Sequence, residues 1–148
     1  MERGDRFPDF KLLDENGEIF DSKMLEGVRF IMYLYSGDND LESVIEASDF
    51  NDVYPKLILR NIPIIGVSGD DPVSHQKFIK TNGLKIKLLT DTDHEFSKKV
   101  DAWKETEGVV SSTFVINKKG TIDVVWHNVI VKGHADQVYD RVKSMMKL

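Results

Sequence analysis

Cysteine is absent from this sequence of 148 residues. Its absence excludes disulfide bonds and thiolate metal sites, although it says nothing by itself about the redox compartment. Long apolar runs are absent too, since none approaches the roughly 20 residues that a membrane-spanning helix needs. The N-terminal residues Met1 to Asp5 also lack the apolar core of a signal peptide. We therefore expect a cytoplasmic protein that has no membrane partner.

Positive charge is scarce. The chain has 20 Lys and Arg against 25 Asp and Glu, which gives a net charge of −5. Binding to nucleic acid or to an anionic membrane surface needs a basic footprint, and no basic cluster offsets this balance. We therefore expect no nucleic-acid partner.

The length and composition predict one globular domain over residues 1–148. Hydrophobic residues make up 41% of the chain and charged residues 30%, with no internal repeat, low-complexity segment or linker. A chain of this length can bury about 68–70% of its unfolded surface, which is enough for a sizeable core.

The apolar pattern alternates between strands and helices. It predicts a hairpin at 10–13 and 18–20, strands at 28–35, 62–67 and 87–90, helices at 41–61, 72–82, 93–100 and 135–147, and a second hairpin at 113–116 and 121–126. Asp71 and Pro72 form a helix start and Gly83 a helix stop, whereas Pro55 should kink or interrupt its helix. This order predicts an α/β fold of thioredoxin-like type, with a central mixed sheet flanked by helices and an N-terminal hairpin.

Two serines, Ser43 and Ser48, lie five residues apart where an apolar strand gives way to a helix. A thiol in that setting is nucleophilic, because its pKa can drop to about 3.5–7.5 beside a helix N-terminus or a cation. A serine hydroxyl gains no comparable ionisation and needs an adjacent base. The histidines are His75, His94, His127 and His134. The sequence places none of them near this loop, so we interpret Ser43 as a capping or first-turn residue.

The start of the same helix is the most acidic stretch of the chain. Its carboxylates are Asp38, Asp40, Glu42, Glu46, Asp49 and Asp52. Oxygen ligands at short spacing can bind calcium or magnesium, so Asp38, Asp40 and Glu42 are weak candidates for a metal site. The segment lacks the glycine and spacing of a calcium-binding loop, and Asp38 and Asp40 also suit capping or first-turn positions. We expect a solvated acidic helix start with no metal and no cofactor.

Six segments in a fixed order resemble the peroxiredoxins, in particular the bacterioferritin-comigratory-protein or peroxiredoxin Q group. They are Pro8-Asp9-Phe10 with Asp14-Glu15-Asn16-Gly17, Tyr33-Leu34-Tyr35, Glu46-Ala47-Ser48-Asp49-Phe50, Ile65-Gly66-Val67-Ser68-Gly69-Asp70, Leu88-Leu89-Thr90-Asp91, and Ser112-Thr113-Phe114-Val115-Ile116 followed by Lys119-Gly120. The resemblance spans nearly the whole chain and implies a thioredoxin-like fold of peroxiredoxin type.

The resemblance also implies an active site, whose residues this chain has replaced. Members of the family reduce peroxides with a Pro-x-x-x-Thr-x-x-Cys loop and a distant arginine. Matched position by position, the proline becomes Ser36, the threonine Asp40 and the peroxidatic cysteine Ser43. The resolving cysteine becomes Ser48, and the arginine before the last hairpin becomes Ser111.

Two explanations compete. An engineered cysteine-to-serine form would change Ser43 and Ser48 only, and would represent a thiol-dependent peroxidase served by a thioredoxin-type reductant. A natural homologue that has lost the reaction would also lose the supporting residues, and here Ser36, Asp40 and Ser111 replace all three. We therefore favour natural loss and a domain retained for binding or assembly, as a monomer or a homodimer, with any protein partner unidentified.

Overall fold

A mixed sheet of seven strands forms the centre of the computed structural model, which describes residues 1–146. In order across the sheet, the strands are β2 (Ile19–Asp21), β1 (Lys11–Asp14), β5 (Lys87–Thr90), β4 (Ile64–Ser68), β3 (Phe30–Leu34), β8 (Ser112–Ile116) and β9 (Ile122–His127). The central strands β3, β4 and β5 run parallel, and the strands on both sides pair antiparallel. Both predicted hairpins are therefore confirmed.

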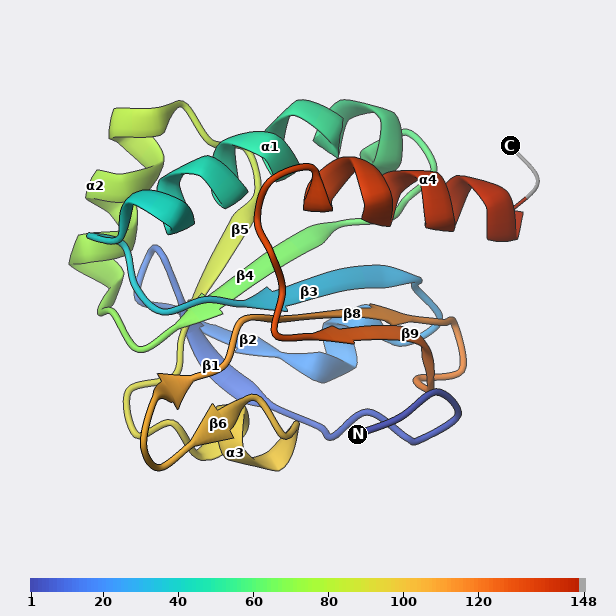
Figure 1. Cartoon of the computed structure of the whole chain (residues 1–148), viewed down its shortest axis with the longest axis horizontal. Helices are drawn as coiled ribbons and strands as arrows, with labels where there is room; N and C mark the ends of the chain where they lie inside the picture. Colours follow the sequence, from blue (N-terminus) through green and yellow to red (C-terminus); the bar gives the residue numbers. More distant parts are fainter. Residues whose placement is uncertain (147–148) are drawn as a thin grey trace.

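Helices cover both faces of this sheet (Figure 1). On one face lie α1 (Leu41–Ile58), α2 (Pro72–Asn82) and α4 (His134–Met146). The other face carries α3 (Glu95–Lys99) and a small hairpin of β6 (Trp103–Lys104) and β7 (Gly108–Val109), and a 3₁₀ turn, η1 (Ser22–Leu25), follows β2. Within the described part of the chain, no helix combines the length and the apolar character needed to cross a bilayer.

Strand β3 is buried on both faces, and its alternating side chains contribute to two apolar cores. Ile31 and Tyr33 enter the core beneath α1, α2 and α4. Met32 and Leu34 enter the opposite core, which α3 and the N-terminal segment complete. Because a parallel strand covered on both faces needs apolar side chains throughout, the unbroken apolar run of the sequence matches its position.

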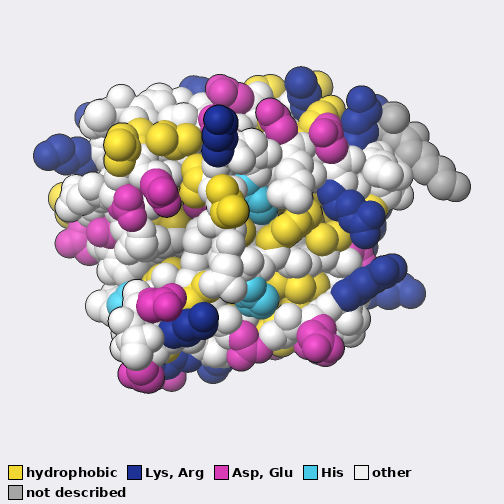
Figure 2. All heavy atoms as spheres, in the orientation of Figure 1, with side chains coloured by type: hydrophobic (Ala, Val, Ile, Leu, Met, Phe, Trp, Pro, Cys, Tyr) yellow, Lys and Arg dark blue, Asp and Glu magenta, His cyan; other side chains and the backbone are white. Residues whose placement is uncertain are grey.

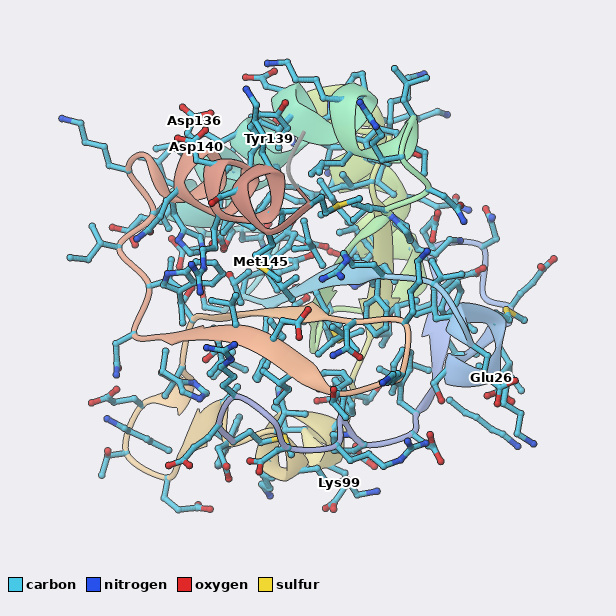
Figure 3. All side chains as sticks on the ribbon, turned by 90° about the vertical axis from the view of Figure 1, so that its right-hand side faces the viewer. Glu26, Lys99, Asp136, Tyr139, Asp140 and Met145 are labelled. Carbon is cyan, nitrogen blue, oxygen red and sulfur yellow. The ribbon has the colours of Figure 1, made fainter. Side chains whose placement is uncertain are left out.

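The packing of α4 follows its amphipathic sequence (Figure 3). Val138 and Val142 are fully buried against the sheet. Tyr139 lies toward α1, where Lys56 Nζ is 5.1 Å from the centre of its ring, and Asp136 lies on the outer side of the helix. The helix therefore joins the sheet and α1 through one apolar face.

Local signals at helix ends are confirmed. Asp71 caps α2, because its Oδ1 atom accepts a hydrogen bond of 2.8 Å from the Ser74 N–H, and Pro72 takes the first helical position. Gly83 ends α2 in the left-handed conformation, with φ of 60°, which costs glycine little.

Other boundaries differ from the predictions. The predicted interruption at Pro55 is wrong, because α1 continues past it to Ile58. Pro55 lies near the last turn, where buried Val53 and Leu57 on either side hold the helix on the sheet. The hairpin of β6 and β7 is missing from the sequence prediction, and the predicted helix end at Lys147 lies outside the described residues.

We predict that Phe50→Ala lowers the free energy of unfolding by about 3–5 kcal/mol. Phe50 is fully buried on α1 and stacks on Tyr33 with ring centres 4.6 Å apart. Urea unfolding followed by circular dichroism measures the loss. Leu59→Ala, at the exposed end of α1, serves as the control and should change stability by less than about 0.5 kcal/mol. Equal effects of both substitutions would contradict the core assignment.

Candidate functional site

The loop between β3 and α1 lies at the carboxyl ends of the central parallel strands, the edge where α/β sheets place their sites. Asp40 begins α1 as its cap, since its Oδ1 atom accepts a hydrogen bond of 3.1 Å from the Glu42 N–H. Ser36 Oγ donates to the other oxygen of Asp40 at 2.6 Å. Asp40 is therefore the capping carboxylate that the sequence predicts, and Ser36 fixes its position.

Ser43 lies in the first turn of α1 and is 4% exposed. It lines a small cavity of about 50 Å³, which we call the Ser43 cavity. The residues around this cavity are Tyr35, Ser36, Asp40, Glu42, Ser43, Glu46, Val109, Ser111 and Val131. The fold thus gathers four positions matched to the family's active site, Ser36, Asp40, Ser43 and Ser111. Ser48 lies further along α1 and is not among these nine residues.

Glu46 is buried, although its sequence position predicts a place in a solvated acidic stretch. Glu46 is 2% exposed, and its Oε2 atom has no hydrogen-bond partner among residues 1–146. Burial, together with the negative charges of Asp49 and Glu42, raises its pKa to about 8. Its spacing of three residues from Ser43 puts both side chains on one helix face, and this signal could have identified it.

A second buried oxygen lies close to the same helix. Tyr33 is fully buried on β3, and its hydroxyl has no hydrogen-bond partner in the described structure. Burial and the charges of Glu46 and Asp38 raise the pKa of Tyr33 well above its usual value. Gly66 makes room for this ring, because a Cβ atom there would come within 2.9 Å of Tyr33 Cζ.

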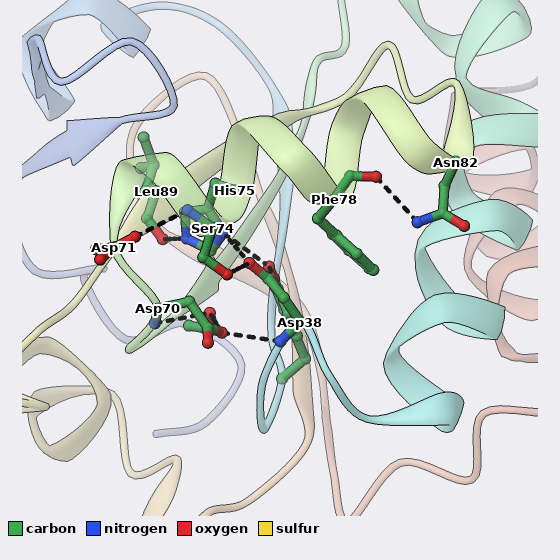
Figure 4. Close-up of polar contacts among 10 residues, drawn as sticks. Asp38, Asp70, Asp71, Ser74, His75, Phe78, Asn82 and Leu89 are labelled. Carbon is green, nitrogen blue, oxygen red and sulfur yellow. Dashed lines mark hydrogen bonds and ion pairs between the residues drawn. The ribbon is translucent and has the colours of Figure 1, made fainter.

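Asp38 has the opposite environment, because every oxygen of its buried carboxylate has a partner (Figure 4). It accepts hydrogen bonds from Tyr35 Oη at 2.7 Å, from Ser74 Oγ at 2.8 Å and from His75 Nδ1 at 2.8 Å. Burial would raise the pKa of Asp38, but these hydrogen bonds and the charge of His75 hold it below the usual range.

His75 lies between two acceptors. Its Nδ1 atom faces the Asp38 carboxylate, and its Nε2 atom donates to the Leu89 carbonyl oxygen at 3.1 Å. The Leu89 carbonyl oxygen can only accept, so Nε2 carries a ring proton, and a second proton must lie between Nδ1 and the Asp38 carboxylate for that contact to be a hydrogen bond. The sequence is interpreted above as placing no histidine near the loop after β3. That interpretation is wrong for His75, which contacts Asp38 from 37 positions away.

The other catalytic and metal candidates are not assembled into a site. None of the nine residues around the Ser43 cavity is a histidine, so Ser43 has no imidazole base there. Asp38 contacts α2, whereas Asp40 and Glu42 lie at the cavity. Among the described residues, the group with potential metal ligands within 4.8 Å of one another is Asp38, Asp70 and His75. Hydrogen bonds within the protein already occupy Asp38 and His75.

The electrostatics of the Ser43 cavity are uniform in sign. The carboxylates of Asp40 and Glu42 are exposed at its mouth, that of Glu46 is buried, and none of the nine residues carries a positive charge. In the orientation of Figure 2, acidic side chains gather at the left, over the start of α1. Such surroundings disfavour any further negative charge at position 43.

A comparison with protein families identifies this arrangement. The family model described as "AhpC/TSA family" matches residues 3–125, most of the chain. The chain belongs to the AhpC/TSA family. Its relatives place it in the Bcp/PrxQ group of peroxiredoxins, and because it has no cysteine, this member of the AhpC/TSA family lacks the catalytic residue.

Relatives cover the AhpC/TSA chain almost end to end. Peroxiredoxin Bcp of Bacillus subtilis is 32% identical over 152 residues, which cover 98% of this chain and 97% of the relative. A bcp peroxiredoxin of Helicobacter pylori is 34% identical over 147 residues, which cover 95% of this chain and 97% of the relative.

Solved structures confirm the thioredoxin-like peroxiredoxin fold. A cysteine-to-serine mutant of Xylella fastidiosa PrxQ superposes with a TM-score of 0.93 at 28% identity, covering 99% of this chain and 98% of the other. A cysteine-to-serine mutant of Xanthomonas campestris peroxiredoxin Q gives a TM-score of 0.90 at 26% identity, covering 98% and 99%.

We predict that the raised pKa of Glu46 makes stability depend on pH. The folded protein holds this proton up to about pH 8, whereas an ordinary glutamate releases it near 4.5. The stability contributed by the proton is complete below the lower value and is lost as pH rises through the higher one. Relative to Glu46→Gln, the free energy of unfolding should fall by about 3–5 kcal/mol between pH 5 and pH 9.

Urea unfolding at pH 5, 7 and 9 measures this dependence. Comparison with the glutamine variant cancels the titration of the histidines, since both proteins contain them. Asp52→Asn removes an exposed carboxylate from the same helix and should follow the wild-type pH dependence. Parallel profiles for wild type and Glu46→Gln would show that Glu46 ionises normally.

We predict that Asp38→Asn destabilises the fold by about 3–5 kcal/mol, because it breaks the buried pair with His75 and the hydrogen bonds that complete it. Thermal and urea unfolding at pH 7 test this expectation. Asp140→Asn, an exposed substitution on α4, is the control and should stay within about 0.5 kcal/mol of wild type. A loss of stability below about 1 kcal/mol for Asp38→Asn would show that the pair with His75 does not stabilise this loop.

Proposed function

We propose that this AhpC/TSA chain is a non-enzymatic member of the Bcp/PrxQ group, retained as a cytoplasmic binding or assembly domain. The observation that supports this proposal is the Ser43 cavity, in which carboxylates and hydroxyls replace the thiol and the cation of the family's site. The fold around the cavity is intact, so the loss concerns the chemistry of the site rather than the scaffold.

The proposal follows from the electronic demands of peroxide reduction. The family's reaction needs a thiolate that attacks a peroxide oxygen. A serine hydroxyl at position 43 stays protonated at neutral pH and has no imidazole base among the nine residues of the cavity. Asp40 and Glu42 at the mouth would oppose any anion formed there.

Exposed apolar side chains beside the cavity support a binding role. Leu41 and Ile45 on the first turns of α1 are exposed, and Ile130 next to Val131 is 83% exposed. Leu41 and Ile45 lie beside the acidic residues of α1. Ile130 comes directly after Val129, whose N–H donates to the Ser111 carbonyl oxygen at 3.0 Å. This hydrogen bond holds the segment next to Ser111. Exposed apolar side chains next to a recessed polar site are typical of an interaction surface.

The alternative function is thiol-dependent hydroperoxide reduction by a form with cysteines at positions 43 and 48. One observation favours it: the two serines are near-isosteric with cysteine at both expected positions, and Ser43 is buried in the cavity. Both serines lie in one continuous α1, where residues five apart are separated by about 7.5 Å in axial rise. A disulfide between them would require the helix start to unwind. Cysteine codons at positions 43 and 48 of the genomic coding sequence would establish this alternative.

We predict that the purified protein consumes no hydrogen peroxide or organic hydroperoxide above a buffer blank with a thiol reductant present. Ser43→Cys alone should stay within about twofold of the blank, because the surrounding carboxylates keep its thiol protonated. The combined variant Ser36→Pro, Asp40→Thr, Ser43→Cys and Ser111→Arg should exceed Ser43→Cys by about tenfold or more, because it restores a cation.

The double variant Ser43→Cys and Ser48→Cys separates the two functions. An engineered cysteine-to-serine form would regain full turnover in this variant, and that result would reject natural loss. Peroxide turnover by the unmodified chain would reject the proposal directly.

A further inference from the structure

The Ser43 cavity contains a buried acid that the fold leaves unpaired. Glu46 is only 2% exposed, and its Oε2 atom has no hydrogen-bond partner in residues 1–146. Buried carboxyl groups normally have hydrogen-bond or ionic partners, as Asp38 does a few residues earlier. The missing partner of Glu46 therefore points to a group that the chain itself does not supply.

The remaining polar groups around the cavity are all oxygen acceptors or hydroxyls. Glu42 and Asp40 place two more carboxylates at the mouth, and Ser36, Ser43 and Ser111 contribute hydroxyls. A group that donates several hydrogen bonds and carries positive charge satisfies this lining and can pair with the ionised form of Glu46. The potential at the mouth would also draw a cation toward the buried Glu46.

The spacing of the carboxylates favours an extended cation over a metal ion. No three carboxylates of the Ser43 cavity bring ligand atoms within 4.8 Å of one another, whereas Asp38, Asp70 and His75 do elsewhere in the described chain. A guanidinium group has five N–H donors in one plane. It can therefore donate to several separated acceptors, whereas a metal ion needs its ligand atoms close together. The side chains of Val109 and Val131 supply apolar walls for its faces, and about 50 Å³ gives room for more than one water-sized group.

We propose that the Ser43 cavity is a binding site for a guanidinium group, which pairs with the carboxylate of Glu46 and donates to the oxygens at the mouth. The group would come from a small alkylguanidinium molecule or from an arginine side chain of a partner. This proposal rests on the proposed function, because it takes the cavity to serve binding and not thiol chemistry.

Binding should exchange a proton for the cation. The groups that face Glu46 are Glu42 and Asp49 on α1 and Tyr33 on β3. Burial and the charges of Asp49 and Glu42 disfavour its ionised form, whereas Tyr33 is a neutral hydroxyl whose own pKa Glu46 raises. At pH 7 the carboxyl is mostly protonated, so a bound guanidinium must displace a proton. Affinity should therefore rise between pH 7 and pH 9.

Isothermal titration calorimetry with ethylguanidinium chloride tests the proposal. We expect saturable binding at millimolar concentration, with close to one proton released per site at pH 7 when buffers of different ionisation enthalpy are compared. Ethylurea, a neutral analogue of similar shape, should not bind. Glu46→Gln should weaken binding about tenfold or more, whereas Asp52→Asn, which removes a charge from α1 outside the cavity, should leave it within about twofold.

Two further measurements guard against a misfolded variant. Ser111→Arg places a guanidinium beside the cavity from within the chain, so it should raise the melting temperature and abolish binding of ethylguanidinium. In the wild-type protein, the side-chain carboxyl carbon signal of Glu46 in a ¹³C NMR spectrum should titrate at lower pH once the probe is bound.

The source of the group is settled by a second probe, a blocked Ala-Arg-Ala peptide. Binding of the peptide as tight as that of ethylguanidinium supports an arginine of a partner, and binding of ethylguanidinium alone supports a small molecule. Two results would overturn the proposal. One is the absence of ethylguanidinium binding at tens of millimolar, and the other is binding heat that appears only with calcium or magnesium chloride. Neither failure alters the peroxidase test, so the proposed function stands or falls separately.

Discussion

The buried ion pair of Asp38 and His75 determines how the candidate site is held. It ties the loop after β3 to the first turns of α2, and through the Leu89 carbonyl oxygen it reaches β5. An ion pair removed from water is stable only when every donor and acceptor has a partner, and Tyr35 and Ser74 complete this requirement. With the loop fixed in this way, α1 begins at a defined residue, Asp40, and Ser43 and Glu46 face the same cavity.

Two acidic residues on this edge of the sheet show how hydrogen-bond partners determine the pKa of a buried carboxyl group. Asp38 and Glu46 are both almost fully buried, yet the pKa of one is lowered and that of the other is raised to about 8. The difference lies in the hydrogen-bond donors, of which Asp38 has three and Glu46 none among the described residues. The other polar residues around the Ser43 cavity supply hydroxyls and further acids. This chain therefore differs from the family's site in the charge of the whole cavity, not only in the atom at position 43.

Much of the fold could be predicted from the sequence, because its signals are local. The apolar run of β3, the cap at Asp71 and the glycine at position 83 each specify their own conformation, and six family segments specify the order of strands. The hairpin of β6 and β7 could not be predicted, since strands of two residues have no periodicity. The contact of His75 with Asp38 and the burial of Glu46 depend on tertiary packing across the sheet. Acidic residues at a helix start usually face water, so the spacing of Glu46 three residues from Ser43 was the one local sign that it shares the enclosed face of α1.

The continuity of α1 has a consequence for how this domain can evolve. In a chain that cycles between thiol and disulfide at positions 43 and 48, the helix start must stay loose enough to melt, and local stability is limited by that demand. Without thiols, no step of a working cycle requires the first turns to unfold. Under the proposed binding role, substitutions that stiffen this segment would carry no catalytic penalty, and the first turns of α1 could become more rigid than a redox cycle permits.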